Sequence, residues 1–126
     1  MDEAHTIYYK NLLDEALTHI KTPKAMVVGA LATDTNAFEK NKLLFENAIT
    51  NLESKGVHTF NQLPFLDIHY EHSPKNYALK FEIFYKGLIY SKMISTLYVL
   101  PEYENSKGTL AEIEYAKAAN VPVVYL

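Results

Sequence analysis

The sequence predicts an α/β fold in which helices cover both faces of a mainly parallel sheet. Short apolar runs that suit buried strands alternate along the chain with longer segments whose apolar residues recur at helical spacing. Such alternation favours parallel strand pairing through right-handed crossovers. A length of 126 residues and an apolar content of 48% fit one domain with a buried core, so we expect a single domain over residues 1–126.

An N-terminal helix is predicted over residues 3–21, because apolar side chains form a stripe along one face of that segment. The stripe consists of Tyr9, Leu12, Leu13, Ala16, Leu17 and Ile20. The pair Thr22-Pro23 ends the helix. Residues 1–22 therefore form an added helix ahead of the first strand. We expect the stripe to dock on the domain, with a dimer contact as the alternative.

The first strand is predicted over residues 25–31, a short apolar run that contains a pair of valines. Asp34 or Thr35 makes a suitable N-cap for the helix that follows, and Gly56 supplies its stop. The apolar stripe of this helix is Phe38, Leu44, Phe45, Ala48, Ile49 and Leu52. A second strand is expected over residues 58–61.

The second half of the chain continues the same alternation. Residues 66–76 read as a polar loop, and a third helix is marked by Tyr77, Phe81, Phe84, Tyr85 and Leu88. A strand over residues 94–100, a helix over 107–119 and a strand over 121–126 complete the pattern. The predicted architecture is a three-layer sandwich, Rossmann-like or flavodoxin-like, with a mainly parallel sheet of four to five strands. Ligands of such sheets bind beyond the carboxyl ends of the strands.

Composition excludes several classes of protein. The net charge is −3, so we expect no nucleic-acid partner. All twelve basic residues are lysines, which removes bidentate guanidinium binding of phosphate, and the absence of cysteine removes disulfides and thiolate metal sites. The acidic start of the chain does not resemble a signal peptide, and no apolar run approaches the length of a membrane span. We expect a cytoplasmic protein without a membrane partner.

The segment LPEYENSKGTLAEIEYA, residues 100–116, has two interpretations. The first is structural: Thr109 and Glu112 fit a capping box, and Gly108 relaxes the turn. The second is functional: the start of the helix offers unpaired N–H groups to an anion, Ser106 and Thr109 add hydroxyls, and Gly108 allows close approach. Glu112 would then lie in the first turn, ionised by the helix dipole and able to attack a sugar anomeric carbon.

The pattern Ser106-x-Gly108-x-x-x-Glu112-x-x-x-Ala116, followed by Val-Pro-Val at 121–123, resembles the nucleoside 2-deoxyribosyltransferase superfamily. That superfamily includes nucleoside 5′-monophosphate N-glycosidases. The resemblance implies that Glu112 is the nucleophile, which attacks C1′, releases the base and forms a glycosyl-enzyme intermediate. It also implies that Ser106 contacts a 5′-phosphate.

Further positions extend the resemblance over roughly residues 25–126. Gly29 ends the first strand where relatives place a glycine before the substrate, and Asn61 ends the second, which gives both a substrate-binding role by resemblance. Tyr103 follows Leu-Pro, where relatives often carry an aromatic residue, and we interpret it as a base-stacking or sugar-contacting residue. Relatives usually have an aspartate early in the strand before Leu-Pro, where this chain has Ser95 or, in an alternative alignment, Thr96.

The remaining polar residues suggest supporting roles. Asp67 or Asp34 would supply general-acid help to the leaving base. His69, Glu71 and His72 stand close together, but we interpret them as a solvated loop, so we expect no metal and no cofactor. In characterised transferases a neighbouring subunit completes the site, so the resemblance implies a homodimer or higher homo-oligomer.

Two principal functions follow. In the first, the protein is an enzyme that cleaves or transfers at the N-glycosidic bond of a nucleoside or nucleoside monophosphate. In the second, it is a degenerate binding or signalling module that holds a nucleotide without cleaving it, which the serine in place of the family aspartate favours. A flavodoxin-type protein that holds a flavin on the same sheet is a third interpretation.

Overall fold

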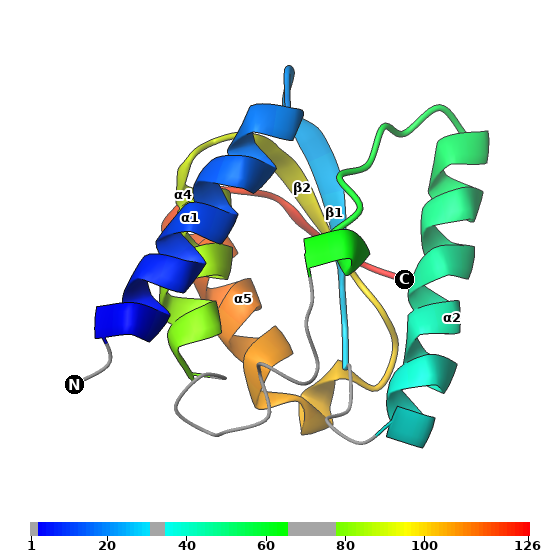
Figure 1. The fold of residues 1–126 in the computed structure, drawn as a ribbon. Coiled ribbons are helices and arrows are strands. Elements are labelled where there is room, and N and C mark those ends of the chain that lie inside the picture. The colour runs from blue at the N-terminus through cyan, green and yellow to red at the C-terminus, as the bar shows by residue number, and fades with distance from the viewer. Residues whose placement is uncertain (1–2, 31–34, 66–77) are drawn as a thin grey trace.

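The computed structural model describes residues 3–30, 35–65 and 78–126, and of residues 35–38 the backbone alone (Figure 1). The expectations for Asp34, Asp67 and the group at residues 69–72 fall outside this part of the chain. The described residues form an α/β fold with a small parallel sheet and helices around it. None of the helices within these ranges is long and apolar enough to cross a membrane.

The described sheet has three strands: β1 (Lys24–Val28), β2 (Ile94–Val99) and β3 (Val123–Tyr125). They pair in parallel in the order β1-β2-β3. Residues 25–28 of β1 are all buried, as expected for a strand that is covered on both faces. The parallel arrangement predicted from the alternating sequence is confirmed.

The predicted second strand at residues 58–61 is reduced to an isolated bridge between Ala25 and Thr59. The Ala25 N–H donates to the His58 carbonyl over 2.9 Å, and the Phe60 N–H donates to the Ala25 carbonyl over 2.8 Å. On the β2 side of the strand, the Lys24 N–H donates to the Met93 carbonyl and the Val28 carbonyl accepts from the Leu100 N–H. This segment therefore lies along the edge of β1 that faces away from β2. Because it forms only a bridge, the described sheet has three strands, and the expectation of four to five strands is wrong for the described residues.

Local hydrogen bonds explain why the bridge does not extend into a strand. A carboxylate oxygen of Glu53, at the end of the preceding helix, accepts both the Thr59 N–H and the Thr59 hydroxyl, each over 2.7 Å. Two residues later, the Asn61 side-chain oxygen accepts the Leu63 N–H over 3.0 Å. The chain then turns into the short helix η1 (Leu63–Phe65), so its backbone leaves the sheet.

Helices cover both faces of the sheet, which gives three layers (Figure 1). On one face lies α2 (Thr35–Ser54), whose Phe45 and Leu52 pack in one cluster with Val27 of β1. The other face is covered by α1 (Glu3–His19), α4 (Lys86–Tyr90) and α5 (Lys107–Ala118), shown together on the opposite side of the sheet from α2.

Helix α1 docks on this second layer, as its apolar stripe predicted. Tyr9, Ala16 and Ile20 are buried in the larger core cluster. Gly87 of α4 allows α1 to approach closely, because a Cβ atom there would lie 2.4 Å from a methyl carbon of Leu13. The added helix is thus part of the core of the domain.

In the third predicted helix, residues 78–79 are α-helical and are followed by a π-helical segment, η3 (Lys80–Tyr85), which continues into α4. A π-helical turn carries an extra residue relative to an α-helix, and such turns often occur at functional sites. Here the segment buries Phe84 and Tyr85 and also the charged Lys80.

Candidate functional site

The chain changes direction between β1 and β2. After β1 it passes through α2 to residues 58–60 on the outer edge of the sheet, and it then returns through η3 and α4 on the opposite face to β2. In open parallel sheets, this reversal leaves a crevice beyond the carboxyl ends of the two central strands. The residues just beyond β1 and β2 are therefore the place to look for a site.

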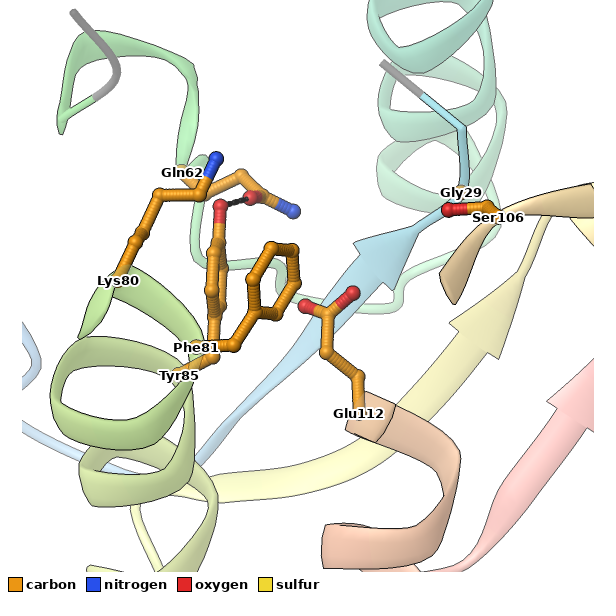
Figure 2. A pocket seen from close by; sticks show the side chains of 7 residues that line it. All are labelled: Gly29, Gln62, Lys80, Phe81, Tyr85, Ser106 and Glu112. Atoms are coloured by element: carbon orange, nitrogen blue, oxygen red, sulfur yellow. Dashed lines mark hydrogen bonds between the residues drawn. The ribbon is translucent and has the colours of Figure 1, made fainter. Parts of the chain in front are cut away.

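A small cavity lies at this position (Figure 2). Its volume is about 20 Å³, which is enough for one water molecule. Segments far apart in the sequence line it: Gly29, Gln62, Lys80, Phe81, Tyr85, Ser106 and Glu112. The cavity brings together three of the residues singled out in the sequence, namely Gly29, Ser106 and Glu112.

Ser106 is the N-cap of α5. Its backbone is extended, with φ −109° and ψ 107°, and its hydroxyl oxygen accepts the Thr109 N–H over 3.2 Å and the Thr109 hydroxyl over 2.9 Å. The predicted capping box, with Thr109 as the cap and Glu112 as its partner, is therefore wrong by one turn. Because Ser106 Oγ already accepts two hydrogen bonds, its own hydrogen is left to donate to a further acceptor.

Glu112 lies in the second turn of α5 and is only 4% exposed. Burial raises the pKa of Glu112 to about 8, and the positive charge of Lys80 opposes this rise. Among the described residues, none forms a hydrogen bond or an ion pair with its carboxyl group. The expectation that the helix dipole keeps Glu112 ionised is wrong, because the carboxyl group lies beyond the first turn, where desolvation outweighs the dipole.

Lys80 brings a second buried charge to the same cavity, since it is 6% exposed. Its Nζ atom lies 5.1 Å from the ring centroid of Phe81 and 5.7 Å from that of Tyr85. The two rings stack on each other with centroids 5.0 Å apart. In Figure 2 the ring of Phe81 stands beside the Glu112 carboxyl group, while Lys80 extends toward Gln62.

Phe81 fills the space above the start of α5. A Cβ atom on Gly108 would lie 2.2 Å from Cζ of Phe81, so only glycine fits beneath this ring. The sequence suggested that Gly108 admits a ligand to the backbone. In this structure the aromatic ring of the protein itself occupies that space.

Gln62 enters the cavity where Asn61 was expected. Its side-chain nitrogen donates to the Val27 carbonyl over 2.6 Å, and its side-chain oxygen accepts a short hydrogen bond from the Tyr85 hydroxyl. Asn61 is exposed and caps η1 instead. Sequence reasoning missed Gln62, Lys80, Phe81 and Tyr85 as lining residues. One usable signal was Lys80, a lysine that falls within the apolar stripe of the third helix.

Two other predicted positions lie away from the cavity lining. Tyr103 belongs to the short helix η4 (Tyr103–Asn105), and its ring packs against Tyr125 with centroids 5.2 Å apart. Ser95 is an exposed residue near the beginning of β2, whereas the cavity lies beyond the end of that strand. Ser95 and Leu100 are five residue steps apart along the chain, roughly 16 Å, so an aspartate at position 95 would not reach this cavity.

Comparison with known families places most of the chain within one family model. The family model described as "Domain of unknown function (DUF4406)" matches residues 27–125, which is most of the chain and leaves out α1. No curated protein and no solved structure gives a significant match.

Proposed function

The chain belongs to the family defined by the domain of unknown function DUF4406, and on that premise we propose that it cleaves or transfers at the N-glycosidic bond of a nucleoside or nucleoside monophosphate, with Glu112 as the nucleophile. The observation that carries this proposal is the state of Glu112. It is a buried carboxyl group without a hydrogen-bond partner among the described residues, in a cavity at the topological switch point. The motif resemblance to the nucleoside 2-deoxyribosyltransferase superfamily supports the same residue.

The energetic cost of this arrangement supports a functional role. A pKa raised from 4.5 to about 8 corresponds to roughly 5 kcal/mol against ionisation of Glu112 in the folded state. A neutral side chain of similar size would avoid this cost. Strongly perturbed carboxyl groups in clefts are typical of catalytic sites, where a carboxylate must be reactive rather than well solvated.

The chemistry follows from the groups around the cavity. The ionised Glu112 carboxylate attacks C1′, and the bond from C1′ to the base breaks with its electron pair moving to the base. A proton supplied to the base completes its departure, and Asp34 and Asp67 are the candidates from the sequence. Water then attacks C1′ of the glycosyl ester and regenerates Glu112, or a second base takes the sugar in its place.

Ser106 and Lys80 suit the rest of a nucleotide. The Ser106 hydroxyl can donate to a phosphate or sugar oxygen, because its lone pairs are engaged by Thr109. Lys80 brings a buried positive charge to the same cavity, which favours the ionised form of Glu112 and attracts a phosphate. In a chain without arginine, a lysine and the amides of α5 are the groups left for this task.

One observation favours a second function, that of a binding or signalling module that does not cleave its nucleotide. The cavity holds about one water molecule, and the Phe81 ring covers Gly108. A nucleoside therefore needs Phe81 to move before its sugar meets Glu112. In the second function, the ligand binds in front of this ring and its C1′ atom never contacts the carboxylate.

Release of free base decides between these functions. Purified protein is incubated with a panel of ribo- and deoxyribonucleosides and their 5′-monophosphates, and liberated base is measured by chromatography. We expect release that is abolished by Glu112→Gln. The matched control is Glu114→Gln on the same helix, because Glu114 is exposed and pairs only at the surface with Lys117 over 3.7 Å.

Thermal shifts with the same panel complete the test. Stabilisation by a nucleotide without any release of base would overturn the enzymatic proposal and favour the binding module. Release that survives Glu112→Gln would remove Glu112 from the nucleophile role. Neither release nor stabilisation with any member of the panel would contradict both functions.

A further inference from the structure

A second and larger cavity opens beside the first, on the face of the sheet that α2 covers. Its volume is about 300 Å³, which is within the range of small-ligand pockets. Its lining comes from α2 and from the residues just beyond β1 and β2: Ala30, Asn41, Leu44, Leu100, Pro101 and Glu102. It therefore lies at the same topological switch point as the Glu112 cavity, on the other side of the strand ends.

The wall between the two cavities is thin. Gly29 lines the Glu112 cavity and the next residue in the chain, Ala30, lines the larger one, so the two linings adjoin along the backbone. The side chain of Leu100 packs closely against Gly29 at this boundary, because a Cβ atom on Gly29 would lie 2.9 Å from Cβ of Leu100. A larger residue at position 29 would thicken the boundary.

The larger cavity has the chemistry of a site for a planar heterocycle. The cavity offers apolar surface to the faces of a ring through Ala30, Leu44, Leu100 and Pro101, and Leu44 is 50% exposed overall. At the same cavity, Asn41 provides an amide that both donates and accepts, and Glu102 provides a carboxylate that accepts. None of the described lining residues is cationic, so they offer no positive charge to a phosphate group.

The geometry of a nucleoside matches two adjoining cavities of different character. Its base and sugar are two rings joined at C1′, the carbon at which the N-glycosidic bond breaks. A pocket for the base must therefore adjoin the cavity that holds the attacking carboxylate. The Glu112 cavity is lined by charged and hydroxyl groups, whereas the larger cavity is mainly apolar with polar groups able to meet a ring edge.

We propose that the cavity lined by Ala30, Asn41, Leu44, Leu100, Pro101 and Glu102 is the nucleobase pocket, in which Asn41 and Glu102 determine which base is accepted. This inference rests on the proposed function for the identity of the ligand. The pocket itself is testable without catalysis, because a free base needs no contact with Glu112.

The test follows methyl signals of Ala30, Leu44 and Leu100 by NMR during titration with free adenine, guanine, cytosine, uracil and thymine, and separately with ribose 5-phosphate. At least one base should shift these signals saturably, while ribose 5-phosphate should leave them unchanged. Asn41→Ala should weaken the affinity for that base by roughly tenfold, which corresponds to the loss of one hydrogen bond worth about 1.4 kcal/mol.

Two tryptophan variants make the location specific. Leu44→Trp fills the pocket and should abolish base binding. Leu43→Trp is the matched control, because Leu43 is the adjacent residue of α2, is 57% exposed and does not line the pocket. Base binding that survives Leu44→Trp as well as it survives Leu43→Trp would overturn the assignment.

The outcomes separate this inference from the proposed function. Bases that bind to wild type and to Glu112→Gln equally, in a protein that cleaves no nucleoside, would support the pocket and contradict the enzyme. Nucleosides that are cleaved while no base shifts the three methyl signals would support the enzyme and overturn the pocket. Absence of both base binding and cleavage would contradict both.

Discussion

The ring of Phe81 rests on the backbone of Gly108, so closely that a Cβ atom on the glycine would lie 2.2 Å from the ring carbon Cζ. This contact joins the π-helical segment η3 to the beginning of α5, and Glu112 lies one turn further along α5 in the same cavity. The glycine that a sequence motif assigned to a ligand thus accommodates an aromatic side chain of the protein. Several testable consequences arise from this contact and from the buried acid beside it.

Replacement of Gly108 by alanine should destabilise the fold by about 1–3 kcal/mol, because the new methyl group overlaps the Phe81 ring. The intrinsic preference of helices for alanine over glycine, about 1 kcal/mol, works in the opposite direction but does not remove the overlap. Chemical denaturation measures the change, with the exposed neighbour Lys107→Ala as control. In the double variant with Phe81→Ala the penalty should vanish, and a penalty that persists would contradict the contact.

Removal of the ring by Phe81→Ala should open the space between Gly108 and Glu112. We expect a loss of about 2–4 kcal/mol in stability and a larger thermal stabilisation by nucleotides than in the wild type, since the ligand no longer has to displace a side chain. Phe65→Ala is the control, because Phe65 packs against the same core without lining the cavity. Equal ligand-induced shifts in Phe81→Ala and wild type would show that Phe81 does not obstruct binding.

Buried Glu112 should make the stability of the protein depend on pH. The folded protein keeps the Glu112 proton up to about pH 8, whereas the unfolded chain loses it near its ordinary pKa of 4.5. Between these values the unfolded state binds fewer protons, so this group's contribution to stability is largest below pH 4.5 and falls as the pH rises. Relative to Glu112→Gln, the free energy of unfolding should decline by up to about 1.4 kcal/mol per pH unit. Parallel stability curves for the two proteins would contradict the raised pKa.

The pH dependence of catalysis distinguishes two roles for the same carboxyl group. A nucleophile must be ionised, so log kcat/KM should rise with unit slope and level off near pH 8, the value to which burial raises the pKa of Glu112 in the free protein. A general acid must carry its proton, so the rate would instead fall above that pH. Steady-state rates of base release between pH 5 and about 9 measure the profile, and a falling limb would assign Glu112 to proton donation.

Ser106→Ala should affect both the helix and the ligand. Loss of the N-cap costs about 1 kcal/mol of stability, and Ser106→Thr should restore most of it. If the Ser106 hydroxyl also donates to a phosphate, the variant should raise KM for a nucleoside monophosphate more than KM for the corresponding nucleoside. An equal change in both KM values would leave Ser106 with a purely structural role.

Much of the fold could be predicted from local patterns. The alternation of short apolar runs with helical stripes correctly predicted parallel strands, helices on both faces and a docked N-terminal helix. The exception was the segment at residues 58–61. There, the hydrogen bonds that the Thr59 N–H donates to Glu53 and that the Leu63 N–H donates to Asn61 redirect the backbone after a single bridge to Ala25. Neither bond is visible in an alternation pattern.

The sequence predicted only those site residues whose position follows from their own segment of the chain. Ser106 and Glu112 come from one short segment of sequence, so both were expected near the start of α5, and Gly29 follows from the rule that strand ends meet at one edge of a parallel sheet. Lys80, Phe81 and Tyr85 come from another helix, and their contact with α5 depends on which face of that helix turns inward. The extra residue of the π-helical segment contributes to that orientation.

The sequence by itself determined that helices cover both faces of the sheet and placed a glutamate near the carboxyl ends of the strands, because both follow from short apolar runs that alternate with apolar residues at helical spacing. Only the tertiary structure decided the protonation of that glutamate. The sequence predicted an ionised carboxylate at a helix start, but burial in a cavity lined by Phe81 and Tyr85 raises the pKa of Glu112 to about 8. Removal of water from a charge depends on every segment that packs around it, and no single stretch of sequence specifies that enclosure.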